Sequence, residues 1–458
     1  MRNKSSFSME AEFTGLDFNS SRLEKRFVRT METLSGHPDK SIWLCSENRA
    51  EAKAIYRLLG NEGLDREEIL RAHREAAIRR MARCGKTILA VQDTTGLNYS
   101  THSKMEGIGY ISANTLGANI HTCLAVTADG VVLGVLSQSS HSRPQPCDRT
   151  RTHDAKKSRP LEEKESFRWV KALWESAGAL PEKQRVVSVC DREGDMYELF
   201  DAAARGGHAF LIRISQNRMA AGNRQILDAI REKRCGGRIA ARIPRDSRRG
   251  FKERDAILQV RYAGFDIKRP EKLNKNKSLK ESHEVWVIHA KEERPPKGTD
   301  PIEWFLMTNE PVESAEAAHE RVIWYTHRWK IEQFHYVLKS GCAVEKLQER
   351  SMGKTAMLVL MYSIIAAAIM NITYAARVYP QLPCSAMFEE DEWKALYCAA
   401  NKTRRPPKKP CTAAEAAIFL SWLGGPKRAP SDGPPGVKTI WIGLGKLNTL
   451  LNYSKWVS

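Results

Sequence analysis

Residues 324–339 read WYTHRWKIEQFHYVLK. The stretch contains no Pro or Gly and is rich in long side chains, so the sequence predicts an α-helix. At about 100° per residue, four polar side chains of this helix share a stripe about 60° wide: Tyr325, Arg328, Glu332 and Lys339. One explanation is a solvated face with ordinary i,i+4 ion pairs. The alternative is a functional stripe, in which a carboxylate for a hard metal ion is flanked by cations suited to phosphate oxygens.

The charge balance of the whole chain is strongly basic. Its 458 residues include 73 Lys and Arg against 54 Asp and Glu, a formal net charge of +19. Such a balance favours a polyanionic partner, most often nucleic acid. Ten Cys are present, but no two are spaced as C-x-x-C, so we expect reduced thiols rather than a zinc ribbon. The polar start of the chain does not resemble a secretory signal, so we expect a cytoplasmic protein.

The N-terminal region is polar at first and then reads as helical. We expect residues 1–20 to be frayed and residues 21–83 to form helices. Arg22, Arg26 and Arg29 recur at helical spacing and could contact a phosphate backbone. A solvated basic face is the alternative explanation for these three side chains.

Two apolar runs that follow each end in a carboxylate. Residues 87–93 end at Asp93, and residues 186–191 end at Asp191. Runs of this kind are typical of buried strands, which would place each acid at the carboxyl end of a strand. Residues 120–137, with Ala-Asp-Gly in the middle, predict a hairpin between them.

Beyond the second carboxylate the sequence predicts a helix and a further strand, to about residue 214. Strands, a hairpin and then strand–helix–strand is the order of an α/β sheet of the ribonuclease-H type. Residues from about 215 to 303 are basic and alternate in polarity, which predicts a β-rich insertion. The chain after residue 346 reads as mostly helical. Its apolar run at residues 356–370 is too short for a confident membrane span, so we expect a buried helix.

Three acids stand out in this basic chain: Asp93, Asp191 and Glu332. A single Asp at a strand end is commonly a turn former. Three acids with cationic neighbours are better explained as ligands of Mg²⁺, which prefers oxygen ligands. Two such ions about 3.5–4 Å apart can activate an attacking oxygen and stabilise the leaving oxygen during phosphodiester cleavage. We therefore expect two Mg²⁺ ions as cofactors, with Mn²⁺ able to substitute.

The spacing of the 324–339 stripe resembles the YREK signature of DDE transposases of the insertion-sequence-four family. Segments 92–95 (QDTT) and 189–195 (VCDREGD) look like the flanks of that family's two aspartates. Segment 306–313 (LMTNEPVE) and the start of the stripe are very similar to the Tn-five-type transposase. The resemblance covers roughly residues 10–345 well and the C-terminal third weakly.

The resemblance implies cut-and-paste DNA transposition by a ribonuclease-H-like catalytic core. Asp93, Asp191 and Glu332 would hold the metal ions. Residues 1–83 would form a helical domain that binds transposon ends. Residues 84–345 would form the catalytic domain with its β-rich insertion. Residues 346–458 would form a helical C-terminal domain that pairs two protomers into a synaptic complex.

The resemblance also implies a set of DNA contacts. Tyr325, Arg328 and Lys339 would bind phosphates near the cleavage point, and Arg213 matches a DNA-contacting arginine. Trp304 stands where an aromatic of the Tn-five type stacks on a base flipped out of the duplex, and stacking contributes about 1–3 kcal/mol per base. An equally good explanation is that Trp304 is a buried core residue of a strand.

Two other functions are compatible with the sequence. The first is a ribonuclease-H-like nuclease or resolvase that uses the same acids without strand transfer. The second is an inactive DNA-binding relic of a transposase. For the transposase, double-stranded DNA (the transposon ends and the target) is the expected partner, and a bacterial, nucleoid-associated location in the cytoplasm is expected.

Overall fold

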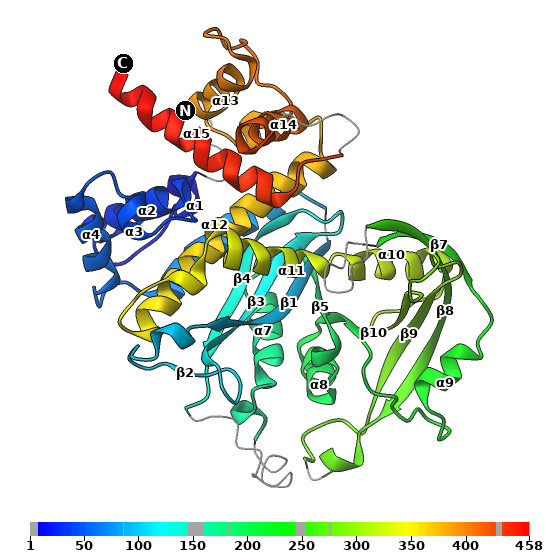
Figure 1. The fold of residues 1–458 in the computed structure, drawn as a ribbon. Coiled ribbons are helices and arrows are strands. Elements are labelled where there is room, and N and C mark those ends of the chain that lie inside the picture. Colours follow the sequence, from blue (N-terminus) through cyan, green and yellow to red (C-terminus); the bar gives the residue numbers. More distant parts are fainter. Residues whose placement is uncertain are drawn as a thin grey trace.

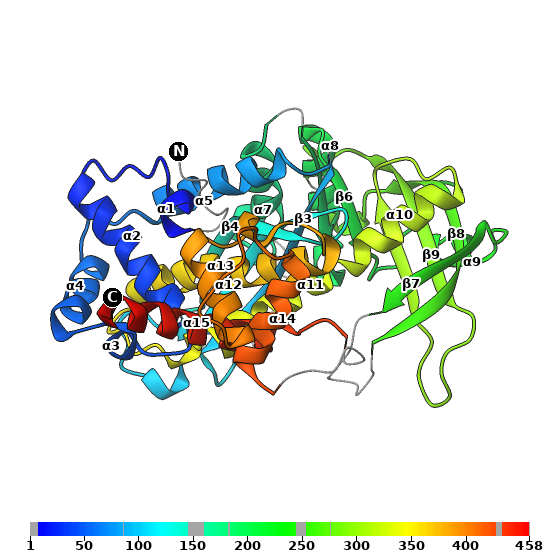
Figure 2. The same cartoon turned by 90° about the horizontal axis from the view of Figure 1, so that it is seen from above.

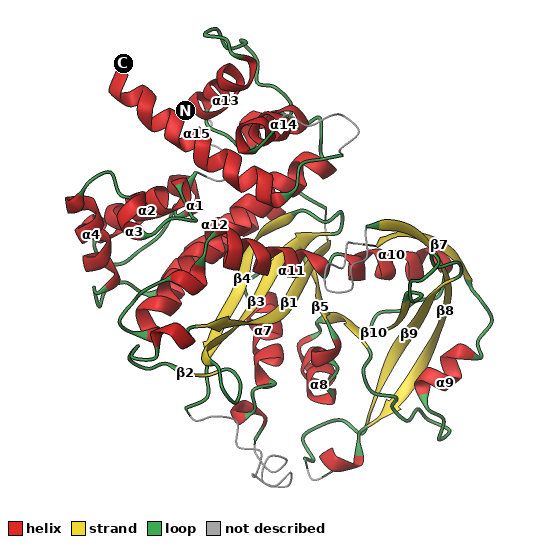
Figure 3. Ribbon diagram, in the orientation of Figure 1, coloured by secondary structure: helices red, strands yellow, loops and turns green. Residues whose placement is uncertain are grey.

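A computed structural model describes residues 8–85, 87–144, 160–181, 184–243, 253–274, 276–426 and 433–457. Its centre is a ten-stranded sheet with helices packed around it (Figures 1 and 3). The strands are β1 (Thr87–Asn98), β2 (Gly109–Tyr110), β3 (Leu116–Thr127), β4 (Val132–His141), β5 (Arg185–Cys190), β6 (Ala209–Arg213), β7 (Gly237–Ile243), β8 (Arg254–Lys268), β9 (Ser282–Glu292) and β10 (Glu303–Thr308).

The first half of the sheet has the strand order of a ribonuclease-H-like fold. β4 and β2 pair with β3, and β3 pairs antiparallel with β1. β1 then pairs parallel with β5, and β5 pairs parallel with β6. A three-strand meander followed by two parallel strands is the order that the sequence predicted, and the predicted fold class is confirmed. The hairpin between β3 and β4 turns at Gly130, whose φ of 92° favours glycine.

The β-rich segment extends this sheet instead of forming a separate layer. β10 pairs antiparallel with β6, and β9, β8 and β7 follow in order toward the far edge. Figure 1 shows these strands at the side of the molecule opposite the N-terminal helices. The side chain of Arg213, at the end of β6, therefore lies where the two halves of the sheet meet.

Most of the helices surround the first half of the sheet, and two from the middle of the chain pack on the β-rich half (Figure 2). At the N-terminus they are α1 (Met9–Glu12), α2 (Ser21–Gly36), α3 (Ile42–Cys45), α4 (Arg49–Leu59) and α5 (Arg66–Met81). In the middle of the chain they are α7 (Phe167–Gly178), α8 (Tyr197–Gly206), α9 (Ile226–Arg231), α10 (Ala315–Thr326) and α11 (Trp329–Tyr336). At the C-terminus they are α12 (Met352–Val378), α13 (Glu390–Asn401), α14 (Ala413–Gly424) and α15 (Val437–Val457).

Helix α12 is the central helix of the molecule. Among the described helices it is the one long and apolar enough to cross a membrane, but 89% of its apolar window is buried inside the protein. It packs against β4 and also contacts α2, α14 and α15. The buried helix expected at residues 356–370 is confirmed, and it joins the N-terminal and C-terminal helices to the sheet.

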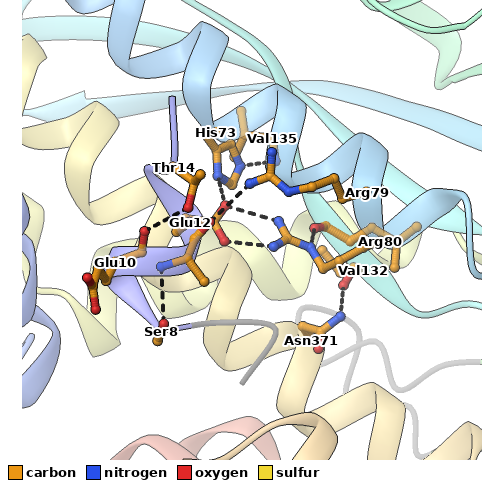
Figure 4. Close-up of polar contacts among 12 residues, drawn as sticks. Ser8, Glu10, Glu12, Thr14, His73, Arg79, Arg80, Val132, Val135 and Asn371 are labelled. Carbon is orange, nitrogen blue, oxygen red and sulfur yellow. Dashed lines mark hydrogen bonds and ion pairs between the residues drawn. The ribbon is translucent and has the colours of Figure 1, made fainter. Parts of the chain in front are cut away.

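The start of the chain is more ordered than its polar sequence predicted. The expected fraying does not hold for residues 8–18, because Met9, Phe13 and Phe18 are buried in the core. The Glu12 carboxylate, also fully buried, lies 2.5 Å from His73 Nδ1 and 2.7 Å from Arg80 Nη1 (Figure 4). This ion cluster attaches α1 to α5.

The same cluster also reaches the sheet. Arg80 Nε donates a hydrogen bond to the carbonyl of Leu133 (2.8 Å), and the backbone N–H of Val135 donates to His73 Nε2 (2.8 Å). Both partners belong to β4, so the first helices are fixed to the edge of the catalytic sheet.

The stretch 324–339 is not the single α-helix that the sequence predicted. Helix α10 ends at Thr326, α11 covers Trp329–Tyr336, and Val337–Gly341 form a π-helical turn. At the junction the backbone makes tighter i→i−3 hydrogen bonds, such as Arg328 N to Tyr325 O at 3.0 Å. The imidazole of His327 holds this junction against the β3–β4 hairpin through the carbonyl of Ala128, 2.9 Å away.

Candidate active site

The two aspartates lie on neighbouring parallel strands. The last paired residues of β1 and β5 are Val91 and Val189. Asp93 and Asp191 each follow two residues later, so both side chains leave the same face of the sheet. Adjacent strands are about 4.8 Å apart, which brings the two carboxylates close together.

One detail of this arrangement differs from expectation. We predicted that Asp93 would end its strand, but β1 continues to Asn98 because β3 keeps pairing with it as far as Gly117. On the other side β5 stops at Cys190, so Asp93 has no parallel neighbour beyond that point. Asp93 therefore lies in a continuous strand that is paired with β3 on one side and unpaired with β5 on the other.

The Asp93 carboxyl lies in a buried environment close to a second negative charge. Burial raises the pKa of Asp93 to about 7, and the negative charge of Asp191 adds to this effect, while Arg328 opposes it. Each carboxylate also accepts one backbone hydrogen bond. Asp93 Oδ1 accepts from the N–H of Thr94 at 2.7 Å, and Asp191 Oδ1 accepts from the N–H of Glu193 at 2.8 Å.

Arg328 connects the aspartates to Glu332. Its Nη1 lies 3.6 Å from Asp93 Oδ2, and its Nη2 lies 2.5 Å from Glu332 Oε1. Burial disfavours the charge of this guanidinium, but Tyr325, Glu332 and Asp93 outweigh burial and raise its pKa. The contact between Arg328 and Glu332 is the one that their i,i+4 spacing predicts, and Arg328 also contacts Asp93.

Tyr325 and Arg213 form a second part of the same site. The Tyr325 side chain is buried, with 2% exposure, and its hydroxyl bonds to the Arg213 side chain. Burial raises the pKa of Tyr325, while Arg328 and Arg213 lower it. The phenol thus interacts with two guanidinium groups.

Trp304 lies behind Tyr325 in the core. Its indole meets the Tyr325 ring edge-on, with 5.4 Å between centroids and 67° between planes, and the residue is 5% exposed. In this conformation the indole packs in the core and cannot stack on a DNA base. The structure therefore favours the packing explanation that the sequence left open, and the stacking role stays a prediction that requires the indole to leave its site.

Lys339 lies apart from the rest of the stripe. It sits in the π-helical turn, and its Nζ donates to the carbonyl of Gly96 at 2.6 Å and lies 3.8 Å from Glu345. Its ammonium group therefore flanks β1 beyond Asp93 and does not touch Arg328 or Glu332. Arg328 interacts with both Tyr325 and Glu332, as the predicted stripe requires, but Lys339 departs from the stripe because the helix changes to a π-helical turn after α11.

A buried polar network beneath the aspartates was missed by sequence reasoning. The hydroxyl of Thr94 lies 2.9 Å from Arg168 Nε and 2.9 Å from His121 Nδ1. His121 Nε2 lies 3.0 Å from Gln92 Oε1, and Gln92 Nε2 donates to Ser188 Oγ at 2.7 Å. No local motif marks these residues, because they come from four separate elements.

The direction of the hydrogen bonds in this network follows from Arg168, Gln92 and the neutral ring of His121. Arg168 donates to the Thr94 hydroxyl. Gln92 uses its amide group to donate to Ser188, so its carbonyl oxygen accepts from Nε2–H of His121. In the neutral imidazole, Nδ1 then accepts from the Thr94 hydroxyl. Burial lowers the pKa of His121 well below the usual value, which agrees with this assignment.

The three acids do not form a closed set of metal ligands in this conformation. Within the described ranges, no group of three His, Cys, Asp or Glu side chains is arranged to hold a metal ion. Arg328 lies between Asp93 and Glu332 and supplies the positive charge there. The chemistry of the set still fits a hard divalent cation: it has three carboxylates, and burial together with the charge of Asp191 raises the pKa of Asp93. Binding would require Arg328 to move from this position.

The three N-terminal arginines line a groove between α2 and α4. The groove has a volume of about 630 Å³ and is also lined by Lys25 and Asn48. Arg29 lies 3.3 Å from Glu51 across it. Arg22 and Arg29 are exposed and Arg26 is half-buried, so the groove offers a cationic wall to solvent.

Comparison with known families gives two matches at opposite ends of the chain. Residues 7–64 match the family model described as "Transposase DNA-binding". Residues 364–457 match the model described as "Transposase Tn5 dimerisation domain". Both matches support a Tn5-type transposase. The insertion-sequence-four resemblance of the central region is consistent with this family.

A solved structure of a piggyBac transposase synaptic complex with hairpin DNA is also similar. The match has 10% sequence identity and a TM-score of 0.38, and it covers 96% of this chain and 73% of that chain. A similarity at this level adds no argument about the site.

The two family matches assign activities to the ends of the transposase. The DNA-binding match contains α2 and α4, so the groove with Arg22, Arg26 and Arg29 lies inside it. The dimerisation match begins within α12 and ends with α15. The transposase therefore binds DNA and dimerises.

Proposed function

We propose that this transposase is a DDE enzyme that cuts and joins DNA with divalent metal ions held by Asp93, Asp191 and Glu332. The observation that carries the proposal is the placement of Arg328, which contacts both Asp93 and Glu332 beside Asp191. A buried guanidinium between carboxylates marks a place where positive charge is required. Two Mg²⁺ ions, with Mn²⁺ as a substitute, would there activate the attacking oxygen and stabilise the leaving oxygen.

The cationic and phenolic groups around the acids are suited to binding the phosphates of a DNA backbone. Arg213 and Arg328 both interact with Tyr325, and guanidinium groups bind phosphate through paired hydrogen bonds. Lys339 adds an ammonium group beside β1. These four side chains would orient the cleaved phosphodiester against the three acids.

The ends of the chain would complete the reaction. The groove of the N-terminal domain, residues 1–83, would bind the inverted repeats at the transposon ends. The C-terminal domain, residues 346–458, would hold two protomers together in a synaptic complex. The catalytic domain between them, residues 84–345, would cut the ends and transfer them to target DNA in the bacterial cytoplasm, at the nucleoid.

The assignment of the acids is tested by three single variants: Asp93→Ala, Asp191→Ala and Glu332→Ala. Each should abolish cleavage while DNA binding stays nearly intact, because affinity for DNA comes mainly from Lys and Arg. A gel shift and a cleavage assay on duplex DNA from the two sides of the gene measure both effects. A variant that still cuts removes its residue from the triad.

A further inference from the structure

We propose that Arg168 is a positioning residue that fixes both catalytic aspartates at once. The inference rests on the proposed role of Asp93 and Asp191. Arg168 touches neither carboxylate. It holds the two residues, Thr94 and Glu193, whose backbone N–H groups hold the carboxylates.

The first contact is on β1. Arg168 Nε donates to the hydroxyl of Thr94 at 2.9 Å. The backbone N–H of the same threonine donates to Asp93 Oδ1 at 2.7 Å. Because the Thr94 hydroxyl is also bonded to the buried His121, its side chain is held from two sides. The position of the Asp93 carboxylate is therefore tied to the guanidinium.

The second contact is on the turn that follows β5. Arg168 Nη2 donates to Glu193 Oε2 at 2.7 Å. The backbone N–H of Glu193 donates to Asp191 Oδ1 at 2.8 Å. Each aspartate thus accepts one backbone N–H, and the Arg168 side chain bonds to both residues that donate these N–H groups.

Arg168 itself is rigidly placed on α7. Its Nη1 donates to the carbonyl of Glu165 at 2.7 Å, and its guanidinium lies 5.8 Å from the ring centre of Trp169. Its side chain is 15% exposed. The three contacts use all three guanidinium nitrogens, a planar fork that lysine cannot reproduce.

The test compares variants that differ by single hydrogen bonds. Arg168→Ala removes the whole support, and Thr94→Val removes one hydroxyl. Thr94→Ser keeps that hydroxyl and serves as its matched control. Lys171→Ala removes a cation that lies one turn further along α7, with a half-exposed side chain paired to Glu175.

Three quantities are measured for each variant. They are the cleavage rate on duplex DNA from the two sides of the gene, the affinity for that DNA without divalent metal, and the Mn²⁺ concentration that gives half of the maximal rise in melting temperature without DNA. Changes beside a metal ligand commonly reduce metal affinity or activity by about 10–100-fold. We therefore expect Arg168→Ala and Thr94→Val to slow cleavage by about 10–100-fold and to raise the Mn²⁺ midpoint by about tenfold.

The controls should behave like the wild type. Thr94→Ser and Lys171→Ala should keep the cleavage rate and the Mn²⁺ midpoint, and DNA affinity should stay within about twofold throughout. The double variant Arg168→Ala with Thr94→Val should lose less than the product of the single losses, because the two residues share one contact.

Two results would overturn the inference. Wild-type cleavage by Arg168→Ala would refute it. An unchanged Mn²⁺ midpoint together with a general loss of DNA binding would make Arg168 a folding residue. Asp93→Ala, run in parallel, separates this inference from the proposed function. If Asp93→Ala is inactive and unresponsive to Mn²⁺ while Arg168→Ala is normal, the positioning role alone fails, whereas cutting by Asp93→Ala refutes both.

Discussion

Replacing Glu12 with Gln is expected to destabilise the transposase strongly. Burial alone raises the pKa of this carboxyl, but the charges and hydrogen bonds of Arg80 and His73 outweigh burial and lower the pKa from 4.5 to about 2. A shift of this size corresponds to about 3 kcal/mol of folding free energy at neutral pH. Glu12→Gln should lose about this amount, because it leaves the buried Arg80 without its charged partner.

The pH dependence of this loss follows from the direction of the shift. A carboxyl whose pKa is lower in the folded state stabilises the protein fully above its unfolded value, near pH 5, and the effect disappears as pH falls toward 2. The gap in unfolding free energy between wild type and Glu12→Gln should therefore shrink from about 3 kcal/mol at pH 7 to about 1.5 kcal/mol at pH 3.

Urea unfolding of the purified proteins at both pH values measures the gap. Glu67→Gln is the control, because Glu67 lies on the same α5 with a side chain 70% exposed. It should change stability by less than about 1 kcal/mol. A gap for Glu12→Gln that equals the control, or one that is the same at pH 3 and pH 7, would show that the buried cluster does not stabilise the N-terminal helices in this way.

Two further variants test other parts of the account. Trp304→Ala should lower stability by about 3–5 kcal/mol, measured as a fall in melting temperature, because the indole fills the core. An unchanged melting temperature with loss of a late cleavage step would instead support base stacking. Changing Arg22, Arg26 and Arg29 together to Gln should weaken DNA binding in gel shifts and flatten the slope of log affinity against log salt by about 2–3. An unchanged slope would mean that the groove does not contact phosphates.

Much of the catalytic sheet was predictable from local patterns. Uninterrupted apolar runs identified β1 and β5, since strands buried on both faces lack polar alternation. The Ala-Asp-Gly turn identified the β3–β4 hairpin. The i,i+4 spacing of Arg328 and Glu332 predicted their contact, because a single turn of helix separates them whatever happens on either side.

Other features depend on contacts between distant segments. Arg168 and Thr94 are 74 residues apart, and nothing near either residue marks their contact. The pairing of β10 with β6, which joins the β-rich segment to the core sheet, is likewise set by tertiary packing. Residues 1–20 were predicted to fray because their polar side chains outnumber the apolar ones, although the apolar Met9, Phe13 and Phe18 become buried.

The most direct test of the proposed function is a strand-transfer reaction. Purified transposase is mixed with labelled duplex DNA from the two sides of the gene and with a supercoiled plasmid, with Mg²⁺ or with a chelator. The account predicts joined products from the wild type with Mg²⁺ only, and none from Asp191→Asn, which should still shift the labelled DNA in a gel. Joined products from Asp191→Asn, or from the wild type in the chelator, would contradict it.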